Sequence, residues 1–412
     1  MTGRQGATRF ARGALRALRL LAKPVRRSQG KAGTVIETYR GYGSRDEVFL
    51  IGRVFRQSQR SATAVNEGWA AELRDIRRRI TRRSVAGAVL TARFFGCTEE
   101  VVTDRDGYFR VHLHPRLPAP PEASWHTMDL DLAGPEPVHA KGQVFIPSAQ
   151  CRRVIISDID DTIMRTGVAN KLKMLWRLFV EDAENRVAFP GAAALYRALY
   201  AGPCGGEGNP MLYVSRAPWG IYDMLSEFFT MHRIPVGPVM FLREWGLSWK
   251  SPLPRRAEDH KRDLIERMLS LYHDLPFVLI GDSGQHDPEV YGQVVAAHPG
   301  RVVAVYIRNV SHDASRISEI AKLAEAVEAA GSSLVLAADS LAMAEHAAEH
   351  GLIDRNAVAE VAREWSADGT APRTRRHAGR TQARALRKVL GETGATPPNV
   401  IVEPRRHDPP AL

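Results

Sequence analysis

The sequence predicts an α/β domain built on a parallel sheet, preceded by a small β-sandwich-like domain. The α/β domain is indicated from residue 151 onward, where short apolar runs alternate with helical patterns, as in consecutive βαβ units. The β-rich domain is indicated over residues 34–150, where short runs of alternating apolar and polar residues are separated by turn residues. At 412 residues, the chain is long enough for two or three domains with full hydrophobic cores.

Four apolar runs are expected to form buried strands of the α/β domain. They are the run from Val154 to Asp158, followed by Met211–Val214, Phe277–Ile280 and Val302–Ile307. Helices are expected between them, at about residues 188–200, 218–231, 258–272 and 288–298. Residues 314–364 are predicted to add helices rich in Ala and Glu, interrupted by one short apolar run at Ser333–Ala337, and to complete the domain.

Polar residues whose side chains could take part in catalysis follow these strands at the points where the strands end. Asp158 and Asp160 end the first run, Ser215 follows the second, and Asp282 follows the third. The carboxyl ends of parallel strands meet at one edge of a sheet, so these side chains are expected to lie together. Clustered carboxylates repel one another and require a compensating cation. The alternative is a helix amino terminus, where the helix dipole favours acidic residues without any chemistry.

These residues resemble the four motifs of the haloacid-dehalogenase-like phosphatases. The motifs are Asp158-x-Asp160-x-Thr162, Ser215 after a strand, Lys261 on a helix, and Gly281-Asp282 with Asp287. The longer strings Tyr213–Trp219 and Gly281–Glu289 are similar to the phosphatidate phosphatase family named for the yeast actin-patch protein. The resemblance runs from about Gln143 to Val310 and implies a Rossmann-like parallel sheet for residues 151–365.

The chemistry of a phosphate monoester matches this set of residues. Its slow hydrolysis requires a nucleophile, a proton donor and positive charge. Asp158 is expected to attack phosphorus and form an aspartyl-phosphate, while Asp160 acts as general acid and then as general base. Ser215 and Lys261 are expected to hold the phosphoryl oxygens. Thr162 is expected to cap the following segment or to bond an oxygen of Asp158.

A magnesium site is the second expectation at this edge. Asp158, Asp282 and Asp287 offer the hard oxygen ligands that Mg²⁺ prefers over zinc, and the backbone carbonyl of Asp160 could also face the metal. Asp287 has an alternative role, because an Asp before Pro288 is a common helix N-cap. Both roles for Asp287 can hold at once.

Lys261 and Trp219 each have two competing interpretations. Lys261 lies in the charged run Glu258–Asp263, which would ordinarily be an exposed helix face. Its position between the second and fourth motifs favours a role in the site instead. Arg216 is expected to contact substrate, while Trp219 at a helix start is as readily explained by packing.

Six alternating runs define the expected β-rich domain. They are Thr34–Thr38, Glu47–Val54, Ala88–Phe95, Gly107–His114, His126–Leu132 and Val138–Ile146. A helix is expected near residues 64–82, and Asp104–Gly107 has the composition of a tight turn. This domain is expected to support the catalytic domain, with recruitment of a membrane or protein partner as the alternative.

Charge is concentrated at the two ends of the chain. Residues 1–33 contain nine Lys and Arg and no acid, while residues 371–412 contain nine basic and three acidic residues. Because the whole chain carries +11 and these ends together carry +15, the residues between them carry −4. The basicity therefore belongs to the ends and not to the expected folded domains.

The basic ends are expected to behave differently from each other. Residues 9–27 fit an amphipathic helix with basic residues on one side, the kind that lies in an anionic membrane surface. A solvated tail, a mitochondrial-type presequence and a nonspecific nucleic-acid arm are the alternatives. Residues 366–412 are rich in Arg, Pro, Gly and Thr and are expected to be disordered.

The sequence therefore predicts a Mg²⁺-dependent phosphatase. By the family resemblance its substrate is phosphatidate, which would yield diacylglycerol and phosphate. The alternatives are a soluble phosphomonoester or phosphoprotein as substrate, and a membrane-surface binding protein whose catalysis has lapsed. Three cysteines without a pairing motif and the lack of a secretory signal or a membrane span favour the cytoplasm or the inner membrane surface. No nucleic-acid motif or protein partner is indicated.

Overall fold

A computed structural model describes most of the chain, apart from its two ends and six internal gaps. The described residues are 33–56, 83–134, 137–159, 189–215, 222–241, 257–311 and 313–368. They belong to two compact units that meet in the sequence between Ala149 and Gln150. The expected helix at 64–82, the amphipathic segment 9–27 and almost all of the expected basic tail lie outside these residues.

The first unit consists of β-strands. They are β1 (Thr34–Thr38), β2 (Gly41–Gly43), β3 (Val48–Arg56), β4 (Arg83–Ser84), β5 (Val89–Phe94), β6 (Cys97–Val102), β7 (Tyr108–Leu113), β8 (Trp125–Leu132) and β9 (Val138–Phe145). All six alternating runs expected from the sequence are confirmed as strands. The predictions missed β2, β4 and β6, since β2 and β4 are very short and the middle of β6 is exposed and polar.

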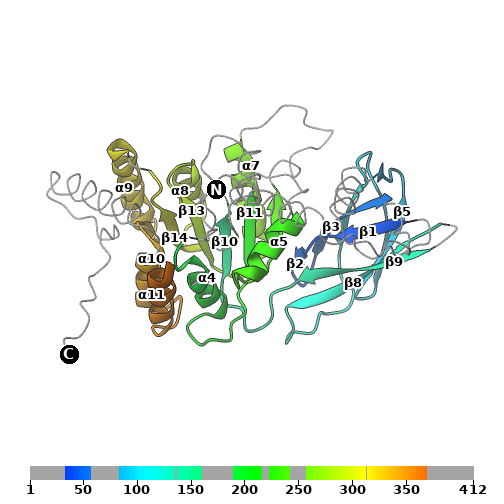
Figure 1. Cartoon of the computed structure of the whole chain (residues 1–412), viewed down its shortest axis with the longest axis horizontal. Helices are drawn as coiled ribbons and strands as arrows, with labels where there is room; N and C mark the ends of the chain where they lie inside the picture. Colours follow the sequence, from blue (N-terminus) through cyan, green and yellow to red (C-terminus); the bar gives the residue numbers. More distant parts are fainter. Residues whose placement is uncertain are drawn as a thin grey trace, which may run out of the picture. The chain divides into compact units, whose positions relative to one another are not determined.

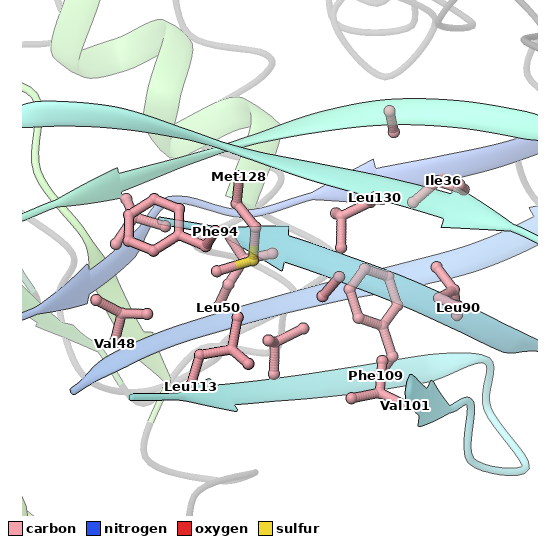
Figure 2. Close-up of a cluster of buried hydrophobic side chains, with 14 of the residues drawn as sticks. Ile36, Val48, Leu50, Leu90, Phe94, Val101, Phe109, Leu113, Met128 and Leu130 are labelled. Atoms are coloured by element: carbon pink, nitrogen blue, oxygen red, sulfur yellow. The ribbon is translucent and has the colours of Figure 1, made fainter. Parts of the chain in front are cut away.

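These strands form one hydrogen-bonded network around a single apolar core. The main path runs β1-β3-β2-β9-β8-β5-β6, and β4 and β7 also pair with β3. Figure 2 shows core side chains such as Leu50, Phe109 and Met128 pointing into the same interior from different strands. The alternation of buried and exposed residues along β3, β7, β8 and β9 produces this core. A division of the strands into two packed layers, as in a sandwich, stays a prediction.

The expected turn at Asp104–Gly107 is confirmed. The carbonyl of Asp104 accepts a hydrogen bond from the backbone N–H of Gly107, over 3.0 Å. The Asp104 carboxylate also accepts from the N–H groups of Asp106 and Tyr108. The side chain of Asp104 therefore satisfies the turn's own backbone donors, which is the reason that Asp favours such positions.

The second unit contains a six-stranded sheet in which every pair of neighbours is parallel. Its strands are β10 (Val154–Asp158), β11 (Met211–Ser215), β12 (Val239–Phe241), β13 (Phe277–Asp282), β14 (Val302–Arg308) and β15 (Leu334–Ala337). The four expected strands and the parallel arrangement are confirmed. β12 was not predicted, and β15 is the short apolar run that was expected within a helical region.

Helices cover this sheet in two groups, seen on opposite sides of the strands in Figure 1. In the first group α4 (Ala192–Ala201), α10 (Ser340–Glu349) and α11 (Ala357–Asp368) contact one another. In the second, α8 (Asp287–Ala297) packs against both α7 (Ala257–Leu271) and α9 (Ala314–Ala329). A further helix, α5 (Tyr222–Met231), connects β11 to β12. The helix α11 continues through Ser366, where the basic tail was expected to begin.

The order of the strands determines where a site can form. The sheet runs β12-β11-β10-β13-β14-β15, which in chain order is the 3-2-1-4-5-6 pattern of doubly wound α/β sheets. From β10 the chain adds β11 and β12 on one side, then crosses back and adds β13, β14 and β15 on the other side. The winding therefore reverses between β10 and β13. In open α/β sheets of this kind, ligands generally bind outside the carboxyl ends of the strands at such a reversal point. Asp158 ends β10 and Asp282 ends β13.

No helix among the described residues is long and apolar enough to cross a membrane. None of the three cysteines, all of which lie in the described residues, forms a disulfide.

Candidate active site

Three buried aspartates meet at the carboxyl ends of β10 and β13. Asp158 and Asp282 have no exposed surface, and Asp287 is 1% exposed. One carboxylate oxygen from each lies within 4.8 Å of the others. We call Asp158, Asp282 and Asp287 the aspartate cluster. These are three of the four residues expected to hold a metal, and the fourth, Asp160, lies outside the described residues.

Within the described ranges, the cationic side chain bonded to the cluster is that of Lys261 on α7. Lys261 is 2% exposed, and its Nζ donates to Oδ1 of Asp158 over 2.9 Å and to Oδ1 of Asp287. Burial alone would lower the pKa of Lys261, but the charges of Asp158 and Asp287 outweigh it, so the pKa is raised. Lys261 is therefore a charged member of the site, and its alternative interpretation as part of an exposed helix face is wrong.

Asp287 points into the cluster instead of capping its helix. The helix α8 begins at Asp287 itself and has His286 at the N-cap position, so the alternative N-cap role of Asp287 is wrong. Its Oδ2 accepts from the backbone N–H of Asp282 over 3.3 Å. This close approach requires a glycine at position 281, where an added Cβ would lie 2.3 Å from Oδ2 of Asp287.

A glutamine that was not predicted as a site residue bridges two members of the cluster. Nε2 of Gln285 donates to Oδ2 of Asp282 over 2.9 Å and to Oδ2 of Asp158 over 3.4 Å. The N–H of Gly284 donates to the other oxygen of Asp282 over 2.8 Å. Each oxygen of the aspartate cluster therefore accepts at least one hydrogen bond from the chain. The position of Gln285 inside the Gly281–Glu289 string was the one sequence signal that pointed to it.

Ser215 lies near the cluster along the sheet edge. It is the last residue of β11 and is 1% exposed. β11 pairs with β10 so that Val214 lies opposite Asp158, which puts Ser215 one position further along the neighbouring strand. The expected site residues Thr162 and Arg216 lie outside the described residues, as does Trp219.

The hydroxyl of Tyr291 borders the site from α8. It donates to the carbonyl of Ile280 over 3.2 Å. Burial raises the pKa of Tyr291 well above its ordinary value, and the charges of the aspartate cluster raise it further. Tyr291 is therefore neutral, and it adds no negative charge to the cluster.

The balance of charge favours a bound cation. Among the described residues, three buried carboxylates meet one ammonium, which leaves an excess of negative charge. All of the anionic donors are carboxylate oxygens, which suit a hard divalent cation such as Mg²⁺. By the chemistry of its donors, the aspartate cluster fits the expected metal.

Comparison with known proteins assigns a family resemblance to the same part of the chain. Residues 153–309 match the family model described as the catalytic domain of phosphatidate phosphatase APP1. The Saccharomyces cerevisiae protein named phosphatidate phosphatase APP1 is 30% identical over 164 residues, which cover 40% of this chain and 27% of the yeast protein. An uncharacterized Schizosaccharomyces pombe protein is 28% identical over 159 residues, which cover 39% of this chain and 25% of that protein. The expected resemblance to this phosphatase family is confirmed, and the chain spans about a quarter of the length of these relatives.

Among solved structures, a carbohydrate acetylesterase from Xanthomonas citri aligns with a TM-score of 0.24 and 12% identity, over 70% of this chain and 72% of the other. A TM-score this low does not indicate a common fold.

Proposed function

We propose that this protein is a Mg²⁺-dependent phosphatase with a haloacid-dehalogenase-like catalytic domain that acts through an aspartyl-phosphate on Asp158. The observation that carries the proposal is the aspartate cluster with Lys261, buried at the reversal point of the sheet. The match of residues 153–309 to a phosphatase family supports the same reaction.

In the first step, Asp158 attacks the phosphorus atom of the ester. The new bond joins a carboxylate oxygen of Asp158 to phosphorus, and the bond from phosphorus to the ester oxygen breaks with its electron pair on that oxygen. Asp160, in its protonated form, gives its proton to the departing oxygen, so the leaving group is an alcohol. Lys261, and Ser215 at the end of β11, are the groups proposed to bind the phosphoryl oxygens.

In the second step, water attacks the phosphorus atom of the aspartyl-phosphate. Asp160, now a carboxylate, takes a proton from the water, and the bond from phosphorus to Asp158 breaks with its electron pair on the Asp158 carboxylate. The products are inorganic phosphate, free Asp158 and protonated Asp160. One water is consumed per ester, and both aspartates return to their starting forms.

The residues proposed to hold Mg²⁺ are Asp158, Asp282 and Asp287, together with Asp160. When bound, the ion supplies positive charge that offsets repulsion between these carboxylates and the phosphate. Lys261 contributes further positive charge at Oδ1 of Asp158, while Gln285 donates to Oδ2 of the same carboxylate.

Phosphatidate is the proposed substrate, and diacylglycerol is then the alcohol released. The resemblance to a family named for this activity supports this choice. The basic segment 9–27 is proposed to bind the anionic membrane that contains the substrate, where each Lys or Arg contributes about 1 kcal/mol. This arrangement would put the protein at the cytoplasmic surface of a membrane.

The test is phosphate release from phosphatidate in mixed detergent micelles, with and without Mg²⁺, beside a soluble monoester such as p-nitrophenyl phosphate. Asp158→Asn removes the nucleophile with little change in shape, and Asp274→Asn at an exposed position is the matched control. We expect Mg²⁺-dependent release from the lipid by the wild type and Asp274→Asn, and none by Asp158→Asn.

Release from the soluble ester alone would keep the catalytic assignment and refute the lipid one. No release from either substrate would favour the alternative of a binding protein whose catalysis has lapsed.

A further inference from the structure

The loop that follows β13 carries two of the donors to the aspartate cluster. We call residues 283–286 the β13–α8 loop. Its Gly284 N–H and Gln285 side-chain amide bond Asp282, and the same amide reaches Asp158. The direction of these donors depends on the backbone of the loop, because one of them is a backbone group and the other extends from the next residue.

One guanidinium, that of Arg316 on α9, holds this backbone. Nε of Arg316 donates to the carbonyl of Ser283 over 3.1 Å, and Nη2 donates to the carbonyl of Gln285 over 2.8 Å. The two bonds bracket Gly284. An isolated loop of this length would have several accessible backbone conformations, and two carbonyls bound to one rigid planar group select among them.

The guanidinium is itself fixed by carboxylates. Nη1 and Nη2 of Arg316 bond the two oxygens of Glu289 on α8, with Nη2 to Oε2 at 2.9 Å, and Glu319 lies 3.4 Å from Nη1. The side chain of Arg316 is 18% exposed. A two-point ion pair with a partly buried carboxylate sets both the position and the plane of the guanidinium.

The other side of the loop is attached to the end of β14. Oγ of Ser283 accepts from the backbone N–H groups of Val310 and Ser311, over 2.9 and 3.0 Å. The N–H of Ser283 donates to the carbonyl of Arg308 over 2.9 Å. Ser283 is therefore held both by β14 and by Arg316, and Arg316 extends this hold to the carbonyl of Gln285. Loss of Arg316 removes both of its bonds to the loop backbone, at Ser283 and at Gln285.

We propose that Arg316 is a positioning residue for the candidate site, which acts through the β13–α8 loop to direct Gln285 and Gly284 at Asp282 and Asp158. The proposal rests on the proposed function, because Asp158 is the nucleophile of that reaction. Arg316 touches none of the aspartates itself, so its effect on turnover passes through the loop. Its removal lowers kcat and leaves KM nearly unchanged, because the groups proposed to bind the phosphoryl oxygens stay in place.

The chain offers a matched control in Arg301. Its Nη2 donates to the backbone carbonyls of Leu269, Tyr272 and Leu275, and its guanidinium lies over the Phe277 ring at 5.9 Å. Arg301 immediately precedes β14, so it lies at the opposite end of the sheet from the aspartate cluster. Arg301→Gln therefore removes a guanidinium that binds several carbonyls, as Arg316→Gln does, but far from the site.

The experiment compares Arg316→Gln, Arg316→Lys and Arg301→Gln in the full chain, each examined below its own unfolding temperature. For hydrolysis of p-nitrophenyl phosphate with Mg²⁺ we expect kcat to fall at least about tenfold in Arg316→Gln, with KM within about twofold, since small misplacements of reacting groups have effects of this size. Arg316→Lys should give an intermediate kcat, because one ammonium cannot bond two carbonyls and both oxygens of Glu289. Arg301→Gln should keep the kcat of the wild type.

Amide hydrogen exchange at Gly284 tests the same proposal without turnover. We expect faster exchange at Gly284 in Arg316→Gln than in Arg301→Gln or the wild type. Equal kcat and equal exchange in Arg316→Gln and Arg301→Gln would overturn the proposal, as would wild-type kcat in Arg316→Lys. A wild type that releases no phosphate from this ester or from phosphatidate would refute the proposed function, and the exchange measurement would still decide whether Arg316 holds the loop.

Discussion

The Nζ atom of Lys261 lies 2.9 Å from Oδ1 of Asp158, although the two residues are 103 positions apart in the sequence. Both side chains are almost fully buried. Nζ also donates to Asp287, so one ammonium serves two of the three carboxylates in the cluster. This arrangement holds the Asp158 carboxylate in a fixed direction at the end of β10, which suits its proposed role as nucleophile.

Lys261→Met should both destabilise the protein and reduce its activity. Without the ammonium, two buried carboxylates lose their charge partner, and breaking a buried pair of this kind costs about 3 kcal/mol or more of unfolding free energy. We expect turnover to fall at least about 100-fold, as for the loss of a charged group that stabilises a transition state. Urea unfolding and phosphate release measure the two effects. Lys322→Met, at an exposed position of α9, is the control and should change neither; normal turnover in Lys261→Met would contradict the proposed site.

Gln285→Leu tests the contribution of the amide that bridges Asp158 and Asp282. Leucine is similar in size but donates no hydrogen bond, so an oxygen of each aspartate loses a donor. Burying an acceptor that has lost its hydrogen-bond donor costs about 1–3 kcal/mol of unfolding free energy. We also expect kcat/KM to fall by about tenfold, which corresponds to about 1.4 kcal/mol of lost transition-state stabilisation. Gln293→Leu on the exposed side of α8 is the control, and equal kcat/KM in the two variants would exclude a role for Gln285.

Gly281→Ala should disturb Asp287. The added Cβ would lie 2.3 Å from Oδ2 and 2.7 Å from Cβ of Asp287, so the carboxylate or the strand must shift. We expect a loss of about 1–3 kcal/mol in unfolding free energy, typical of overpacking, together with loss of phosphatase activity. Gly292→Ala is the control, because its Cβ would meet nothing nearer than 3.6 Å in the interior of α8. Since alanine favours a helix over glycine, Gly292→Ala should raise stability by up to about 1 kcal/mol, provided that the helix packs unchanged.

Stability should fall on acidification because of His346 on α10. Burial, with a smaller contribution from His350, lowers the pKa of His346 to about 4 from 6.5. The unfolded chain therefore binds a proton at a higher pH than the folded chain does. The contribution of neutral His346 is fully present above pH 6.5 and is lost as the pH falls toward 4.

The size of this effect is about 2 kcal/mol over that interval. We expect urea unfolding of His346→Asn to depend less on pH between 6.5 and 4 than unfolding of the wild type. His273→Asn, at an exposed position, should follow the wild type. Parallel pH profiles for the wild type and His346→Asn would contradict this prediction.

The sequence by itself determined the strands that carry the site. Buried strands such as β10 and β13 read as continuous apolar runs, because both faces of a parallel sheet are covered. Their acidic ends are visible in the sequence because the pattern lies within a few consecutive residues, and parallel strands bring those ends to one edge. The alternating strands of the first unit are visible for the same local reason, since one face of each is buried and the other is exposed.

Other features were decided only by the tertiary structure. β12 and β6 are strands because they pair with β11 and β5, and pairing of backbone groups leaves little trace in a short or polar segment. β15 lies within a helical region of the sequence and becomes a strand at the edge of the sheet beside β14.

The positions of the hydrogen-bond donors around the aspartates were likewise decided by contacts between segments that are distant in the sequence. Gln285 was visible in a motif, but its bonds to Asp158 and Asp282 were not, and Arg316 reaches the loop from a later helix. Lys261 lies in a charged run that looks solvated when the sequence is taken alone. The packing of α7 in this unit buries Lys261 between Asp158 and Asp287. The charged form of the buried lysine is stabilised by these two carboxylates, which belong to β10 and α8.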